Sequence, residues 1–395
     1  MSNTEYITEV SKKLGEPEWL FTWRKEHEAN SEHLSRTLHY GIGIKGVLPL
    51  TEASFAETVE YHVDAGKAIE LYTWKEAVTQ EEIAPIVQGL MESPFFPKAT
   101  NHWSGLGQAL FSNGLVVYVQ PSMSEDGVLE EEKLTLDTLV PKGTSSDIVI
   151  VIAKEGAKFS LTSALSGAGE GSIFARTLVV LTERDAHVRV IQKQTLTKGT
   201  TALVSSRGIV AGYSSCNWSE IFTGDVSIKS EKENILVGAG AYGDIREGVI
   251  ASETARFDLY SSTKHTASHS TSTIRAAGVA LGNSKTVSRG MIDMEHGVEK
   301  VNGGQEAKFF SFSPKAEVDA IPSLDIASND VNCSHKLSVM HLRDSDTFYP
   351  KLRGLSDDES RALFLEGAFG DVFSGEENEA IMDEVRTLLS QTQFS

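Results

Sequence analysis

The sequence has only two cysteines, Cys216 and Cys333, among its 395 residues. Two cysteines are too few for a disulfide framework, so packing and hydrogen bonds must hold the fold together. No apolar run approaches the roughly 20 residues that a membrane-spanning helix needs. The first residues lack the basic and then apolar stretches of a secretory signal. We therefore expect a cytoplasmic protein with reduced thiols and no membrane segment.

Positive charge is also scarce, with 36 lysines and arginines against 55 acidic residues and a net charge of -19. A chain this acidic is repelled by the phosphates of nucleic acids and by anionic membrane surfaces. The acidic residues are spread along the chain, as expected for a solvated surface. We expect neither nucleic acid nor a membrane as a partner.

Residues 1–100 form the first of three regions and predict a mixed, mostly helical domain. Apolar residues at helical spacing lie between charges here, and two prolines, Pro94 and Pro97, end the region. The helices expected are Glu5–Leu14, Glu18–Leu38, Glu52–Ala65 and Gln80–Met91.

Residues 101–343 are rich in Val, Ile, Thr, Ser and Gly and alternate over strand lengths, as in Gly114–Val119 and Asp147–Ile152. A turn of small residues followed by a strand recurs around four alanines, of which the first two are 29 residues apart. They are Ala157, Ala186, Ala255 and Ala316. This recurrence favours a solenoid or β-helix, in which neighbouring coils bury each other's apolar faces. A β-sandwich is the alternative.

Residues 344–395 predict a helical C-terminal domain. Ser356 and Glu359 have the spacing of a capping box at the start of a helix. A second amphipathic helix is expected over Glu377–Leu389. Such a helix pair is either a docking device or a cap on the solenoid.

The segment 329–335 ends the β region and places Cys333 two residues before His335. On a strand, these side chains point to the same face. Thiolate and imidazole both bind iron or zinc. Two ligands do not complete a metal site, so further ligands would have to come from elsewhere.

Two other histidines, His265 and His269, are spaced like a helical metal-binding pair. The Ser and Thr residues around them favour a strand, on which they would lie about 13 Å apart and could not share one metal. We interpret them as structural or inward-facing. The other cysteine, Cys216, is expected to be buried.

Several segments near the C-terminus resemble the SufB/SufD family, the scaffold subunits of the SUF system for iron–sulfur cluster assembly. The order and spacing of the motifs resemble a SufD-type C-terminus. The residues that carry the resemblance are 314–326, 329–335, 347–349, 353–356 and 359–369, and the segments 265–278 and 15–20 agree with it as well.

The resemblance implies a right-handed parallel β-helix core between N-terminal and C-terminal helical domains. It implies a scaffold rather than an enzyme, which dimerises through the β-helix and forms a transient iron–sulfur cluster at the subunit interface. Cys333 and His335 would be the residues at that site. The partners would be a SufB-like subunit, or a second copy of the chain, and a SufC-like ABC ATPase.

The ATPase would bind the segment Phe348–Phe373 of the C-terminal helices. Some of the candidate contact residues must instead pack the helices internally. The candidates are Arg353, Leu355, Leu363, Phe364 and Phe369.

The sequence departs from the SufB pattern in two places. The segment Lys308–Ser313 lacks the cysteine that SufB-type chains carry there, and Lys336 stands where they tend to have glutamate. The chain is therefore more similar to SufD. The alternatives are a homodimeric scaffold that acts without a distinct SufB and a carbohydrate-active β-helix enzyme, although only 8% of the residues are aromatic. Whether a flavin participates is not decided by the sequence.

Overall fold

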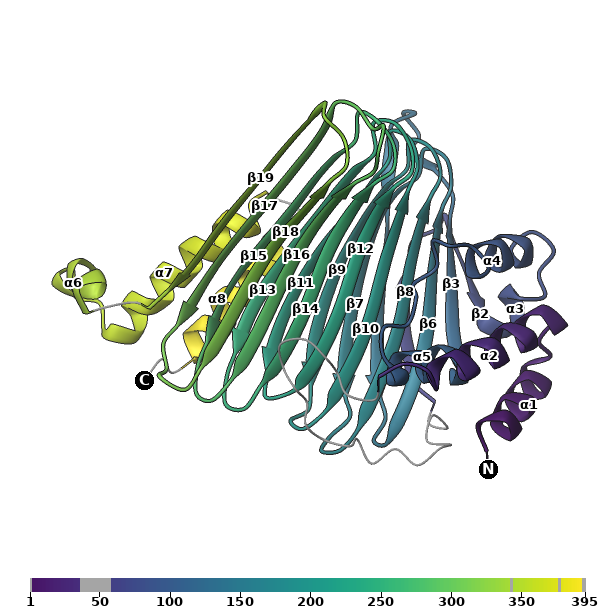
Figure 1. The fold of residues 1–395 in the computed structure, drawn as a ribbon, viewed down its shortest axis with the longest axis horizontal. Helices are drawn as coiled ribbons and strands as arrows, with labels where there is room; N and C mark the ends of the chain where they lie inside the picture. Colours follow the sequence, from purple (N-terminus) through teal and green to yellow (C-terminus); the bar gives the residue numbers. More distant parts are fainter. Residues whose placement is uncertain (1, 36–57, 342–343, 376–377, 393–395) are drawn as a thin grey trace.

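The computed structural model describes residues 2–35, 58–341, 344–375 and 378–392. Two long, twisted sheets form an elongated solenoid, with the N-terminal helices at one end and the C-terminal helices near the other (Figure 1). None of the described helices is both long and apolar enough to cross a membrane. Because the strands of the two sheets make up most of the regular structure, the chain is mainly β.

From β6 to β16 every strand has 10 residues, and the strands nearer the N-terminus vary in length. The first sheet contains, in spatial order, β1 (Glu60–Ala65), β5 (Leu129–Val140), β7 (Lys158–Gly167), β9 (His187–Leu196), β11 (Ser215–Gly224), β13 (Tyr242–Ala251), β15 (Thr271–Ala280), β17 (Val301–Ser311) and β19 (Val331–Met340), with β4 (Ser122–Met123) paired to β5. The second sheet contains β18 (Glu317–Ile326), β16 (Lys285–Met294), β14 (Arg256–His265), β12 (Ser227–Leu236), β10 (Thr201–Val210), β8 (Ile173–Thr182), β6 (Thr144–Ala153), β3 (Asn113–Val119) and β2 (Ile69–Thr73).

Successive strands alternate between the sheets, so each strand pairs in parallel with the strand one coil earlier. Only β1, β2 and β4 pair antiparallel among the described strands, and all three lie near the N-terminal end. Parallel pairing of successive coils confirms the predicted β-helix and excludes a β-sandwich, whose sheets are antiparallel.

The four turn alanines belong to two different edges of the solenoid. Ala157 and Ala186 precede β7 and β9 of the first sheet, where Lys158 pairs with His187 in the next coil. Ala255 and Ala316 precede β14 and β18 of the second sheet. The 29-residue spacing therefore marks one coil. Ala186 and Ala255 lie at opposite edges, whereas Ala255 and Ala316 lie at one edge two coils apart, where Arg256 pairs with Lys285 and Lys285 with Glu317.

The N-terminal helices cover the outer face of the second sheet over β3, β6, β8 and β10. Because both faces of β6 are covered, all ten of its residues are buried, and it is apolar from Ile148 to Ala153. The helices are α1 (Asn3–Leu14), α2 (Glu18–Ser31), α3 (Trp74–Ala77), α4 (Ala84–Met91) and α5 (His102–Leu110).

The N-terminal region differs from the sequence prediction in three places. The prediction of a helix over Glu52–Ala65 is wrong for the residues that the structure describes, because residues 60–65 form β1 and pair with β5. The helices expected from Glu18 and Gln80 are shorter, and Leu38, the predicted end of the first, lies outside the described residues. The helix α5 lies within the region that was assigned to strands.

Charged residues lie inside the solenoid, midway between two apolar layers. Arg176 on β8 donates to Asp147 on β6 (Nε to Oδ1, 2.9 Å) and to the hydroxyls of Thr138 and Ser163. Further along, Lys232 on β12 pairs with Glu220 on β11. Burial raises the pKa of Glu220, and Lys232 opposes that shift. Such buried charges are tolerated because each has a charged or hydroxyl partner.

The two histidines 265 and 269 do not share a strand, which corrects the sequence interpretation. His265 is the last residue of β14 and is fully buried, whereas His269 lies in the following turn with a φ of 61°. The His265 ring nitrogens bond to the hydroxyls of Ser270 (2.7 Å) and Ser272 (2.8 Å). Burial lowers the pKa of His265 to about 4, so the ring is neutral near pH 7.

The buried His265 predicts a loss of stability in mild acid. The unfolded chain binds a proton on this ring below its ordinary pKa of 6.5, whereas the folded chain does so only below about 4. The free energy of unfolding should therefore fall as the pH drops from 6.5 to 4, by about 3 kcal/mol from this group. Urea unfolding of His265→Gln at pH 7 and pH 4.5 should show a smaller loss than the parent chain. The exposed His296→Gln is the control, and equal losses in all three proteins would contradict the assignment.

Two C-terminal helices, α7 (Asp357–Val372) and α8 (Glu379–Gln391), help form an apolar cluster with the outer face of the first sheet. Gly248 on β13 makes room for them: a Cβ there would lie 2.9 Å from Phe373 Cε2 and 3.1 Å from Phe369 Cε1. Asn378 and Ser374 add polar contacts, with Oδ1 of Asn378 accepting from Ser219 (2.8 Å). The predicted capping box is confirmed, since Glu359 N–H donates to Ser356 Oγ (3.2 Å).

Replacing Gly248 should loosen the C-terminal helices. In Gly248→Ala the two phenylalanine rings must move, and we expect a loss of about 1–2 kcal/mol in unfolding free energy. Hydrogen exchange should be faster in α7 and α8 than in the parent chain. Gly304→Ala on β17 is the matched control, because a Cβ at Gly304 meets no atom within 4 Å. Equal effects of both substitutions would contradict this packing role.

Candidate functional site

The solenoid ends in two open strands, one in each sheet. Among the described strands, β19 pairs only with β17, and β18 pairs only with β16. The outer edges of both strands therefore have backbone donors and acceptors that no described strand pairs with. Large apolar side chains on these strands are also 41–49% exposed, namely Ile321, Ile326, Leu337 and Val339. An edge of this kind favours association with another strand.

Cys333 and His335 both lie on the open strand β19. Cys333 pairs in register with Gly303 of β17 and is half-buried against the interior apolar cluster. Burial raises the pKa of the Cys333 thiol, partly opposed by a backbone hydrogen bond at Ser334. The thiol is therefore protonated at neutral pH, and a metal ion or another positive charge would have to stabilise the thiolate.

His335 lies two residues further along β19, on the same face of the strand, and its side chain is exposed. Its register partner on β17 is Gln305, which is buried and donates to the Ser323 carbonyl oxygen of β18 (2.8 Å). The structure thus brings the thiol and the imidazole to the same open end, as the i, i+2 spacing predicts.

The interior next to this end is polar. A small cavity of about 20 Å³ is lined by Glu247, Ser261 and Gln305 among others, and Ser261 donates to Glu247 Oε1 (2.6 Å). No group of three or more His, Cys, Asp or Glu side chains that could hold a metal ion occurs within the ranges that the structure describes. Cys333 and His335 can therefore supply two ligands from this chain.

The C-terminal helices present a second surface with exposed apolar side chains. The helix α6 (Asp344–Leu352) contacts α7 and projects from the solenoid (Figure 1). The most exposed of its apolar residues are Phe348 (60%), Tyr349 (64%) and Leu352 (67%). Tyr349 and Leu352 were not singled out from the sequence, because exposure on a short helix is not visible in its pattern.

The five predicted contact residues of this segment have different environments. Leu363 (52%) and Phe364 (37%) are exposed on α7. Arg353 is exposed and donates to the Tyr349 hydroxyl (2.6 Å), and Leu355 is half-buried. Phe369, on the side of α7 that faces the first sheet, is fully buried. Its side chain therefore packs the helix onto the sheet and does not face a partner.

The solenoid matches a family model described as "SUF system FeS cluster assembly, SufBD core domain" over residues 139–368. This range contains both open strands, Cys333, His335 and almost all of α7. It begins near the end of β5 and so excludes the N-terminal helices.

Several curated relatives carry the same family name. The chain is 22% identical over 278 residues to an iron–sulfur cluster assembly SufBD family protein of Staphylococcus saprophyticus, covering 70% of this chain and 59% of the relative. It is 21% identical over 325 residues to a SufBD family protein of Synechocystis, covering 76% and 67%.

The chain is also 29% identical over 194 residues to the iron–sulfur cluster assembly protein SufD of Bacillus subtilis, covering 49% of this chain and 44% of that protein. The chain thus spans less than two thirds of the length of the first of these relatives. Since the family model covers more than half of the chain, the protein belongs to the SufBD family of SUF-system iron–sulfur cluster assembly proteins.

Proposed function

We propose that this protein is a SufD-like scaffold subunit, not itself an enzyme, that acts in cytoplasmic iron–sulfur cluster assembly. The observation that carries the proposal is the pair of open strands, β18 and β19, with Cys333 and His335 on one of them. A second SufBD-type subunit would cover these edges, and its side chains would supply the ligands that this chain lacks. The nascent cluster would then be assembled at the interface.

Burial of the thiol supports an interface role. The pKa of Cys333 is raised in the isolated chain, so the thiolate forms readily only when iron or a positive charge arrives with the partner. The His335 side chain is exposed, and an imidazole binds iron through a ring nitrogen without forming a thiolate. This difference favours His335 as the ligand that binds first.

Cluster assembly on the protein with a SufB-like subunit tests this site. Anaerobic reconstitution with iron and sulfide should give less cluster in Cys333→Ala and His335→Ala, by about tenfold if each supplies an essential ligand. Cys216→Ala is the matched control, since Cys216 is fully buried in the solenoid and burial raises its pKa. Iron content and visible absorption measure the yield.

The same experiment separates the two scaffold arrangements. A lone protein that holds a cluster would support the homodimeric alternative, in which a second copy covers the open strands. If neither Cys333→Ala nor His335→Ala lowers the yield in the presence of the partner, the site proposal is wrong.

A SufC-like ABC ATPase is the second proposed partner, bound at α6 and α7. Support comes from the exposed apolar side chains there, which include Leu352 and Leu363, while α7 itself is fixed to the sheet. Exposed apolar groups next to a rigid support are typical of a docking surface.

Charged substitutions should therefore weaken ATPase binding without unfolding the chain. Leu352→Glu and Leu363→Glu should each weaken binding by about tenfold or more, measured by titration with a purified SufC-like ATPase. The control is Met123→Glu, because Met123 is 64% exposed on β4 near the other end. Deletion of residues 344–395 is a poor test, since it would expose the apolar face beneath α7 and α8. Unchanged binding in both glutamate variants would exclude this surface.

A further inference from the structure

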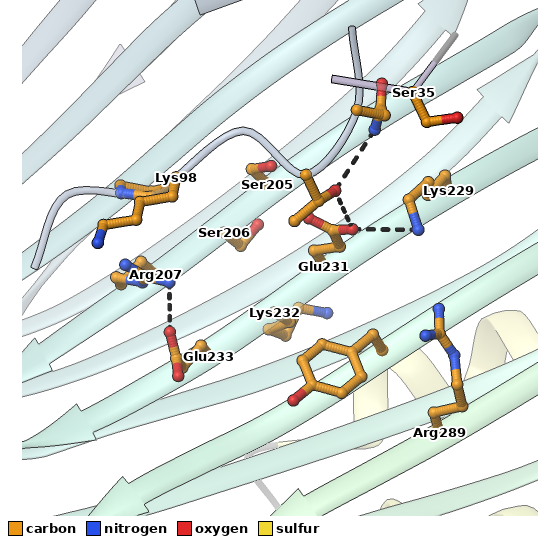
Figure 2. Close-up of a pocket in the computed structure, with 14 residues that line it drawn as sticks. Ser35, Lys98, Ser205, Ser206, Arg207, Lys229, Glu231, Lys232, Glu233 and Arg289 are labelled. Atoms are coloured by element: carbon orange, nitrogen blue, oxygen red, sulfur yellow. Dashed lines mark hydrogen bonds and ion pairs between the residues drawn. The ribbon is translucent and has the colours of Figure 1, made fainter. Parts of the chain in front are cut away.

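A cleft lies on the outer face of the second sheet, whereas Cys333 and His335 lie on β19 of the first sheet. It is formed by β10, β12, β14 and β16 and by the segment 97–101, which leads into α5 (Figure 2). Its volume is about 440 Å³, within the range of small-molecule sites.

The segment that covers the cleft is fixed by hydrogen bonds from the sheet and from α5. Arg207 Nη1 on β10 donates to the carbonyl oxygens of Phe95 (2.9 Å) and Phe96 (3.0 Å). Thr100 Oγ1 donates to Glu231 Oε1 on β12 (2.5 Å). On the α5 side, Gln108 donates to the Pro97 carbonyl (3.0 Å). The cleft is therefore preformed rather than a gap beside a loose loop.

The walls of the cleft carry more positive than negative charge. Arg207 pairs with Glu233, Lys229 pairs with Glu231 (3.0 Å), and Lys229 and Arg289 share Asp258 beneath them. Lys98, on the covering segment, makes no ion pair with any residue that the structure describes. Among the described residues, five cations and two carboxylates line the cleft, in a chain whose net charge is -19.

Two donors in the cleft lack an acceptor among the described residues. Besides Lys98, the Nε–H of Arg207 is buried without a hydrogen-bond partner. Buried donors in folded proteins are nearly always paired, so this N–H still needs an acceptor that the described residues do not supply. An anionic group in the cleft would meet the exposed Lys98 ammonium directly and would reach the buried Arg207 Nε–H only after a shift of that side chain.

The opposite wall offers a flat apolar surface. The ring of Tyr260 on β14 is half-buried in the cleft, and the Arg289 guanidinium lies 5.4 Å from its centroid. Aromatic rings and arginine planes of this kind stack on planar groups.

We propose that this cleft binds a small organic anion, with a phosphate or carboxylate held by Lys98 and Arg207 and a planar ring against Tyr260. This site is independent of the proposed scaffold function. It needs neither the open strands nor the C-terminal helices, so it can fail while the scaffold proposal stands.

Calorimetric titration with two probes tests the proposal, adenosine monophosphate for a phosphate and phthalate for a carboxylate. At least one should bind with a dissociation constant below about 1 mM, and binding should weaken as salt is raised. The probe that binds identifies the anionic group. Binding of neither probe would overturn the proposal.

Variants then locate the bound probe. Lys98→Ala removes an exposed side chain and should weaken binding about tenfold, equivalent to about 1.4 kcal/mol. Tyr260→Leu keeps an apolar wall but loses the ring, and should weaken binding similarly. The control is Lys264→Ala, because Lys264 lies on the same strand as Tyr260, pairs with Glu295 (2.8 Å) and does not line the cleft. Equal affinity in Lys98→Ala and the parent chain, with both folded by thermal unfolding, would also overturn the proposal.

Discussion

Parallel hydrogen bonding between successive coils is the interaction on which the rest of this structure depends. Each strand takes its register from the strand one coil earlier, as when Lys158 sets the position of His187. The stack therefore has to end, and at the C-terminal end no described strand pairs with the outer edges of its last two strands. There the unpaired edges of β18 and β19 lie beside the only half-buried thiol of the described chain. The feature that supports a scaffold function is thus a direct result of how the fold is built.

Stacking also explains why charges are buried inside the solenoid. Strands of neighbouring coils are about 4.8 Å apart, so a side chain on one coil reaches its partner on the next. Asp147 and Arg176 are such partners on adjacent strands of one sheet, whereas Lys232 and Glu220 meet across the interior. Pairing of this kind compensates for the loss of water around each charge. The buried parts of the outer faces are instead apolar, because the N-terminal and C-terminal helices pack apolar side chains against them.

The sequence predicted the features that depend on local pattern. Strand alternation, the 29-residue spacing and the capping box at Ser356 each have a short-range physical cause, and the β-helix and the first turn of α7 followed from them. The strand at residues 60–65 was mistaken for a helix because its partner, β5, lies about 70 residues away. The placement of His269 in a turn was missed for a similar reason, since Ser and Thr residues are common in both strands and turns.

The sequence indicated which residues could belong to a site, but not whether each side chain is buried or exposed. The i, i+2 spacing placed Cys333 and His335 on one face of a strand, and the structure agrees. Nothing in the sequence separated Phe369, which is buried against Gly248, from Leu363, which is exposed on the same helix. The cleft at Tyr260 was not visible either, because its residues come from four strands and a distant segment that only the coil register brings together.

The coil register has a last consequence for the size of the molecule. One coil adds about 4.8 Å to the length of the stack, whereas a single inserted residue would turn every later side chain on its strand to the wrong face. The length of the solenoid therefore changes only in whole steps. The distance between the N-terminal helices and the open edge of β19 is therefore set by the number of coils, and added coils would lengthen it without changing the residues at either end.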